Sequence, residues 1–238
     1  MIPKKLLTII VLVLFSASSS VSWAQMNATI VWDEIKHIAS ENGYKISALI
    51  NQSENGINIT DFSLINKATE TSEVATVEID LLDIQILERS DGSVEIRPDY
   101  GQEITIKLYE GGEVSSFVLK PLSDNTTMVI SGEVGAPAFQ INSSLFGLQL
   151  IEYDLPSVYQ GNEFFEASII LNEMVSNQAF AGKIQDSPKS SFQAGSINLF
   201  LNFDIPAEQM SGLVKYNLED ILVISRQDNL GSNTSANL

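Results

Sequence analysis

The chain has 238 residues, with 13 basic and 30 acidic side chains, one histidine and no cysteine. The absence of cysteine excludes disulfides, thiolate nucleophiles and cysteine-ligated zinc. The formal net charge of −17 argues against nucleic-acid partners and anionic membrane surfaces, because both require a basic patch on the protein.

Residues 1–24 have the order of a secretory signal peptide. Lys4 and Lys5 precede an apolar run from Leu6 to Phe15, and small residues lead to Ala24. We expect cleavage before Gln25, export to the periplasm and no stable membrane span afterwards, since the run is shorter than the ~20 residues of a spanning helix. A retained N-terminal anchor is the alternative. Removing both lysines leaves 214 residues with 11 basic and 30 acidic side chains, a net charge of −19.

One amphipathic helix is predicted from Ala28 to Asn42. Its apolar side chains recur at the three- and four-residue spacing of a single helical face, with Ile30 and Trp32 beside it: Val31, Ile35, Ile38 and Ala39. Asn27 or Thr29 can cap the start of the helix, and Gly43 can end it in a left-handed conformation. A helix this short is not stable alone, so its apolar face must pack on another element.

After Gly43 the apolar residues alternate with polar ones, which is typical of strands with one buried and one solvated face. The alternating segments are 44–46, 57–59, 77–81, 104–108, 197–205 and 214–219. Asp91-Gly92, between Ile84–Leu87 and Val94–Ile96, is the best hairpin candidate. Residues 162–178 fit either period, and we favour a strand there.

These patterns predict a mainly β fold built as an antiparallel meander. The meander forms a curved sheet, a sandwich or an open barrel, and the N-terminal helix packs on it. The meander is predicted to occupy residues 25–226. Residues 227–238 are rich in Asn and Ser and are predicted to form a flexible polar tail. The chain ends without a clear final element, so a longer meander is also an expectation.

No convergent set of catalytic residues is found. His37 lies at the boundary of the predicted helix, so a triad built on it is disfavoured. Several acids lie close together in sequence: Asp80 and Asp83, Asp99 and Glu103, Glu163 and Glu166, and Glu219 and Asp220. Alternation places most of them on a solvated face, whereas a general acid needs partial burial.

Two oxygen-rich turns, 91–93 and 123–125, are weak calcium candidates because they lack the regular spacing of an EF-hand loop. We therefore predict no catalytic residues, no cofactor site and no metal site.

The chain resembles an uncharacterised family of exported alphaproteobacterial proteins, classed as a domain of unknown function. The resemblance rests on Val31-Trp32-Asp33-Glu34 at the helix start, on Gly43-Tyr44 at its exit and on the long acidic β region that follows. It implies a periplasmic location and an all-β scaffold, and it implies no reaction.

The remaining feature is apolar sheet surface, because one helix covers only a few strands of a long meander. We expect a non-enzymatic periplasmic envelope protein, a scaffold or binding protein whose apolar sheet face takes lipid or a protein partner. The alternatives are a carboxylate-based hydrolase and a calcium-dependent adhesion protein. Phe200 interrupts the polar side of the segment 197–205 and suggests a second face that is not simply solvated.

Overall fold

The computed structural model describes residues 27–66, 76–110, 112–133, 136–156, 164–179, 189–206, 209–228 and 231–237. The predicted signal peptide lies outside these ranges. No helix in the described part of the chain is long and apolar enough to cross a membrane.

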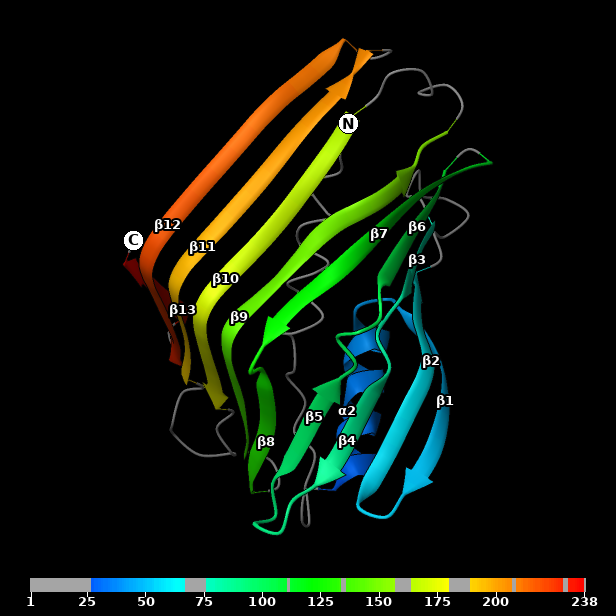
Figure 1. Cartoon of the computed structure of the whole chain (residues 1–238). Coiled ribbons are helices and arrows are strands. Elements are labelled where there is room, and N and C mark those ends of the chain that lie inside the picture. The colour runs from blue at the N-terminus through cyan, green and yellow to red at the C-terminus, as the bar shows by residue number, and fades with distance from the viewer. Residues whose placement is uncertain are drawn as a thin grey trace.

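The described residues form one helix, α2 (Ala28–Glu41), and thirteen strands in a single antiparallel sheet (Figure 1). The strands are β1 (Lys45–Ser53), β2 (Gly56–Asn66), β3 (Thr76–Asp80), β4 (Ile84–Glu88), β5 (Val94–Pro98), β6 (Ile104–Glu110), β7 (Glu113–Asp124), β8 (Thr127–Glu133), β9 (Ala136–Asp154), β10 (Phe164–Ala179), β11 (Lys189–Ile205), β12 (Met210–Asp228) and β13 (Gly231–Asn237). The predicted mainly β, curved antiparallel architecture with an N-terminal helix is confirmed.

The sheet is a meander in which three consecutive segments each cross it as two separate strands: β3 and β4, β5 and β6, and β7 and β8. Consecutive strands β3 and β4 both pair with β2, and β7 and β8 both pair with β9. Between them, β6 pairs with β3 and β7, while β5 pairs with β4 and β8. The pairings therefore run in a closed ring through these eight strands, and β10 to β13 extend the sheet beyond β9.

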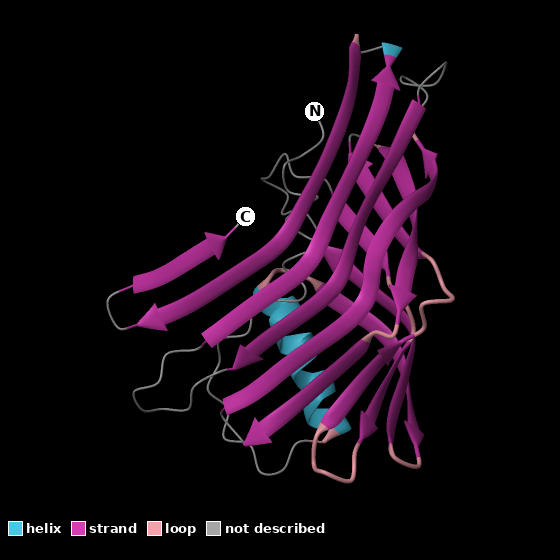
Figure 2. Cartoon of the chain, turned by 60° about the vertical axis from the view of Figure 1, so that its left-hand side comes forward, coloured by secondary structure: helices cyan, strands magenta, loops and turns pink. Residues whose placement is uncertain are grey.

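The breaks line up with residues of positive φ in and between the longer strands, and we call this row of residues the bend line. Asp61 in β2, Asn125 between β7 and β8, Glu173 in β10 and Asp220 in β12 all have positive φ, at 51–52°. The ladders lack pairs at Glu173, Gly195 and Asp220 without any change of register, which places these three residues side by side. Figure 2 shows the long strands turning at mid-length.

Helix α2 begins and ends as the sequence predicts. The Asn27 side chain accepts a hydrogen bond from the backbone N–H of Ile30 at 2.9 Å, and Gly43 has a φ of 81°. The helix packs against β1, β2 and β4, and Trp32 meets Phe62 edge-on with ring centroids 5.4 Å apart. Trp32, expected beside the apolar stripe, is among the most buried helical residues, while Ile38 is only half-buried.

The core lies between the helix and the face of the sheet that we call the inner face. Its sheet residues come from both sides of the bend line, including Ile57, Ile86 and Val94 on one side and Ile79 and Ile106 on the other. The bend thus brings two parts of one sheet face around one helix.

Two other local predictions are confirmed and one is corrected. Residues 91–92 form the turn of the β4–β5 hairpin, and residues 164–179 form strand β10. The tail prediction is wrong for residues 231–237, because they form β13 and pair with β12 from Leu222 to Asp228. Without β13, this stretch of β12 would present unpaired backbone N–H and C=O groups, and backbone groups of polar residues satisfy them as well as those of apolar residues do.

Candidate binding face

The inner face of the sheet continues beyond the helix across β7, β9, β10, β11 and β12. From β9 to β12 the cross-strand pairs on this side are apolar between the bend line and the aromatic residues near the far strand ends. They form four rows perpendicular to the strands, which we number from the far end toward the bend line. Because alternate residues on a strand are about 6.7 Å apart, four rows span roughly 20 Å.

The first row is aromatic. Phe165 lies 6.4 Å from Phe117, 6.1 Å from Tyr153 and 6.2 Å from Phe203 between ring centroids, so one line of rings crosses β7, β9, β10 and β11. Offset and tilted ring contacts at these distances are favourable. We call these four residues the aromatic row.

Gly212 extends the aromatic row onto β12. Residue 212 pairs with Phe203, and a Cβ there would lie 2.9 Å from two ring carbons of Phe203. Glycine therefore leaves room for the ring to lie over the backbone of β12.

The other three rows are aliphatic with a few aromatic members. The second contains Leu119, Leu150, Ala167, Leu201 and Val214, the third Leu148, Ile169, Leu199 and Tyr216, and the fourth Phe146, Leu171, Ile197 and Leu218. Most of these side chains are half-buried, while Tyr216 and Leu218 on β12 are 61% and 38% exposed. Helix α2 is not positioned to cover them, since it packs against β1, β2 and β4.

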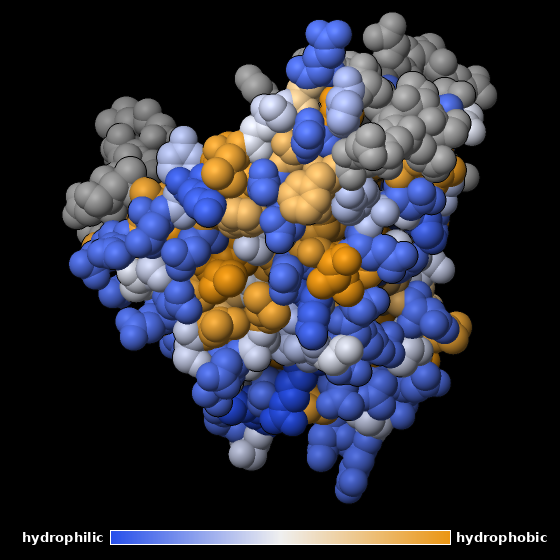
Figure 3. Space-filling model, turned by 45° about the horizontal axis from the view of Figure 1, so that its top comes forward, coloured by the Kyte–Doolittle hydropathy of each residue, from blue (hydrophilic) through white to orange (hydrophobic). Residues whose placement is uncertain are grey.

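The outer face of the same strands mixes polar and apolar residues. Phe200 lies on this side, as its break in the polar pattern suggested, and the Lys215 Nζ sits 5.2 Å from its ring centroid. Figure 3 shows one face of the molecule on which apolar side chains form a central group bordered by hydrophilic ones.

Next to the bend line, hydroxyl groups fill the space between the broken strands. The Ser123 Oγ donates to Thr126 Oγ1 at 2.6 Å, and Ser143, which is buried, bonds Thr126 and the carbonyl of Leu145. The Tyr100 ring packs edge-on against Phe146, and burial raises the pKa of its hydroxyl. The serine and threonine hydroxyls therefore bond one another at the break.

The acids that the sequence placed close together are engaged in separate local contacts. Asp80 pairs with Lys107 at 3.3 Å, Asp83 accepts a hydrogen bond from the Gln102 side chain at 2.8 Å, and Asp99 accepts one from the Gly101 N–H at 3.0 Å. Glu219 accepts a bond from Asn217, and Glu163 lies outside the described residues. No acid–base pair directed at a common point emerges from these contacts.

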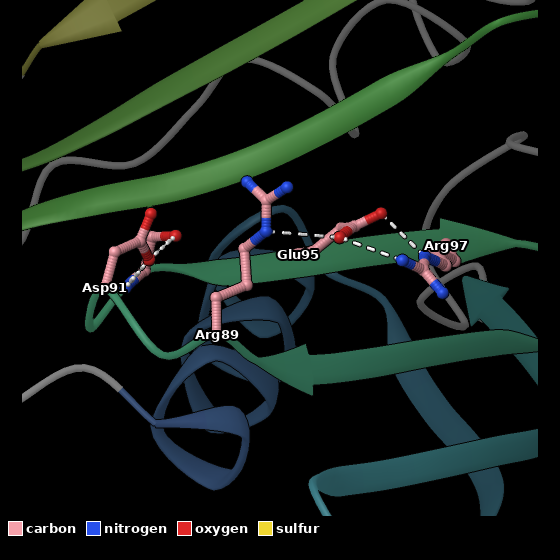
Figure 4. A network of polar contacts seen from close by, with 5 residues as sticks. Arg89, Asp91, Glu95 and Arg97 are labelled. Atoms are coloured by element: carbon pink, nitrogen blue, oxygen red, sulfur yellow. Dashed lines mark hydrogen bonds and ion pairs between the residues drawn. The ribbon is translucent and has the colours of Figure 1, made fainter.

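The buried acid that stands out is Glu95 on β5, which lies between two arginines (Figure 4). Arg97 Nε donates to its Oε1 at 2.6 Å, and Arg89 Nε lies 3.3 Å from its Oε2. The hydrogen bond from Arg97 holds the pKa of Glu95 below its usual value. A carboxylate held in its charged form is a structural anion and is unsuited to donate a proton.

The remaining sequence candidates are surface features. His37 Nε2 lies 3.3 Å from Glu41 on the exposed side of the helix. The Asp91 carboxylate accepts bonds from the Ser93 hydroxyl and N–H within its turn, which lowers its pKa. Within the described ranges, no three acidic or histidine side chains gather as metal ligands would.

Comparisons with protein-family models, with curated proteins and with solved structures found no match to this chain. The family resemblance stated from the sequence therefore stays a prediction. The aromatic row and the bend line were missed by sequence reasoning. Their members lie on different strands, so only the pairing registers align them.

Proposed function

We propose that this protein is a non-enzymatic periplasmic envelope protein that holds the aliphatic chains of lipids on the inner face of its sheet. The observation that carries the proposal is the set of four apolar rows that run from β9 to β12, the first two of which also reach β7, on strands against which helix α2 does not pack. Apolar patches of this extent on a protein surface are commonly binding sites.

The size of the face supports an aliphatic ligand. One leaflet of a bilayer has a hydrocarbon thickness of about 15 Å, half of the ~30 Å core. The four rows span roughly 20 Å along the strands, so an extended acyl chain fits between the aromatic row and the bend line.

The test uses two neighbouring residues of β11 that point to opposite faces. Leu199→Glu puts a charge at the centre of the third row, and Asn198→Glu puts the same charge on the outer face. Protein purified from its own envelope is examined by native mass spectrometry, with circular dichroism as a check on folding. We expect bound lipid in the wild type and in Asn198→Glu, and its loss in Leu199→Glu. Absence of lipid from all three proteins would refute the proposal.

A second candidate, binding of a partner strand, is favoured by the edge strand β1. Among the described strands, β1 pairs only with β2, and its Leu49 and Ile50 are 59% and 47% exposed. Exposed apolar edge strands accept further strands, and lysine blocks such pairing. Leu49→Lys should release a stoichiometric partner on size-exclusion chromatography with light scattering, whereas Gln52→Lys, nearer the strand end, should have a smaller effect.

A further inference from the structure

Strand β12 has described strands on both sides in its second half and on one side only in its first half (Figure 1). Residues 222–226 pair with β11 and with β13, whereas residues 210–219 pair only with β11 among the described strands. Exposure follows this difference. Ile221 is buried and residues 222–223 are half-buried, while residues 210–219 are exposed apart from Gly212 and Val214. We call residues 210–219 the open edge.

The open edge has the properties of a strand that accepts another strand. Alternate backbone N–H and C=O groups along it point away from β11, where no described strand meets them. It also carries exposed apolar side chains on both faces, Leu213 on the outer face and Tyr216 on the inner face. Proline and lysine commonly protect an edge from pairing, yet the open edge contains no proline and a single lysine, Lys215.

The open edge is complementary to itself in antiparallel orientation. A two-fold axis perpendicular to the sheet, passing through one residue of β12, keeps inner residues opposite inner residues. The two charges of the open edge, Lys215 and Glu219, both lie on the outer face. An axis at Asn217 places each of them opposite the other in the second copy, and it places Tyr216 opposite Leu218 on the inner face. An axis at Lys215 would instead oppose two lysines, which is unfavourable.

We infer that two copies of this protein associate through the open edge, with their β12 strands antiparallel and the two-fold axis at Asn217. This inference goes beyond the proposed function and does not depend on it. Cross-strand pairs of opposite charge and of aromatic with aliphatic side chains stabilise a sheet, and the symmetry forms each pair twice. The inner faces of the two copies then lie on the same side of one continuous sheet. Residues 215–219 of each copy form a small interface, so we expect a reversible dimer with a micromolar dissociation constant.

Two cysteine variants test the position of the axis, because the native chain has no cysteine. A residue on the axis lies opposite its own copy, with Cβ atoms about 4.5–5.5 Å apart, close to the separation that a disulfide needs. Asn217→Cys should therefore form a covalent dimer under mild oxidation, seen on a non-reducing gel. Leu213→Cys is the matched control, since it is exposed on the same face of β12 but lies roughly 27 Å along the strand from its own copy. We expect almost no covalent dimer from the control.

Charge reversal tests the pairing itself without a covalent link. Lys215→Glu places two carboxylates opposite each other and should raise the dissociation constant about tenfold, which corresponds to ~1.4 kcal/mol. Glu219→Lys should have the same effect through two ammonium groups, and the double variant should recover the wild-type constant. Lys120→Glu is the control, because it removes an exposed lysine from the outer face of β7 and changes the net charge equally. Sedimentation equilibrium at ~0.15 M salt, where the Debye length is ~8 Å, measures all five proteins.

Circular dichroism checks that each variant is folded, since Lys215 also lies over the Phe200 ring within its own chain. A monomer at every concentration, equal cross-linking of Asn217→Cys and Leu213→Cys, or a dimer that both single charge reversals leave unchanged would overturn the inference. So would failure of the double variant to recover association. These measurements use no lipid, so their failure would leave the proposed function standing, and loss of lipid binding would likewise leave the dimer.

Discussion

Glu95 is the one buried carboxylate among the described residues, and its two arginine neighbours explain why it is tolerated. Its side chain is 11% exposed; Arg97 donates to both carboxylate oxygens, at 2.6 and 3.1 Å, and Arg89 Nε lies 3.3 Å from Oε2. The arginines are themselves about half exposed, so solvent screens part of this interaction. The cluster is a structural ion pair on β5.

We predict that Glu95→Gln lowers the free energy of unfolding by about 1 to 2 kcal/mol at pH 7, because charge-assisted hydrogen bonds to a buried carboxylate are lost. The folded pKa lies below the unfolded value of 4.5, so this stabilisation is complete above that pH and is lost as the pH falls through the folded pKa. Urea unfolding of the wild type and of Glu95→Gln, at pH 7 and at pH 3, measures the difference in their free energies of unfolding. A difference that is unchanged at pH 3 would show that packing, and not charge, is responsible.

Strand β12 contains one residue in a left-handed conformation, Asp220. Asp220 has a φ of 52° at the bend line, whereas its neighbour Glu219 pairs regularly with Ser196. Both side chains are exposed acids, which makes them a matched pair for testing the bend.

We predict that Asp220→Val destabilises the protein by about 1 to 2 kcal/mol, because a β-branched residue is strained at positive φ. Glu219→Val should be near neutral, since valine suits a regular strand position. Thermal unfolding followed by circular dichroism compares the two. Equal melting temperatures for both variants would mean that β12 does not need a left-handed residue at this position.

Helix α2 is an element whose two sides have different roles. Ile35 packs against the core, while the neighbouring Lys36 is exposed and pairs with Asp33 at 2.7 Å. The Ala28 N–H at the start of the helix also donates to the Glu88 carboxylate of β4 at 3.0 Å. The helix is therefore fixed to the sheet by apolar packing together with one polar contact.

We predict that Ile35→Asp costs about 2 to 4 kcal/mol, from lost burial together with the desolvation of a new carboxylate. Lys36→Asp should change stability by no more than about 0.5 kcal/mol. Chemical unfolding of both variants gives the comparison. A small effect of Ile35→Asp would contradict the packing of this helical face.

At the scale of the whole molecule, the location of the protein depends on residues 1–24. We predict cleavage between Ala24 and Gln25, so the intact mass of the protein extracted from the cell envelope should correspond to a chain that begins at Gln25. Osmotic-shock fractionation with a periplasmic and a cytoplasmic marker serves as the control. Detection of the mass that includes Met1 in the envelope fraction would support the alternative, a retained N-terminal anchor.

Local patterns in the sequence predicted the helix, the β4–β5 hairpin and the antiparallel meander. Asn27 and Gly43 bound the helix because capping and left-handed φ are properties of single residues and their immediate neighbours. The alternation of 197–205 likewise defines a strand with one apolar side without reference to the rest of the chain. The sequence by itself therefore determined the features that a few adjacent residues control.

The aromatic row, the bend line and β13 were decided only by the tertiary structure. Phe117, Phe165 and Phe203 become neighbours through the registers of three different strands, and no local pattern sets a register between strands. Asp61 and Asp220 adopt positive φ because the sheet as a whole bends at their level, although both are ordinary strand residues in sequence. Residues 231–237 form a strand through backbone pairing with β12, which no apolar pattern in the sequence indicates.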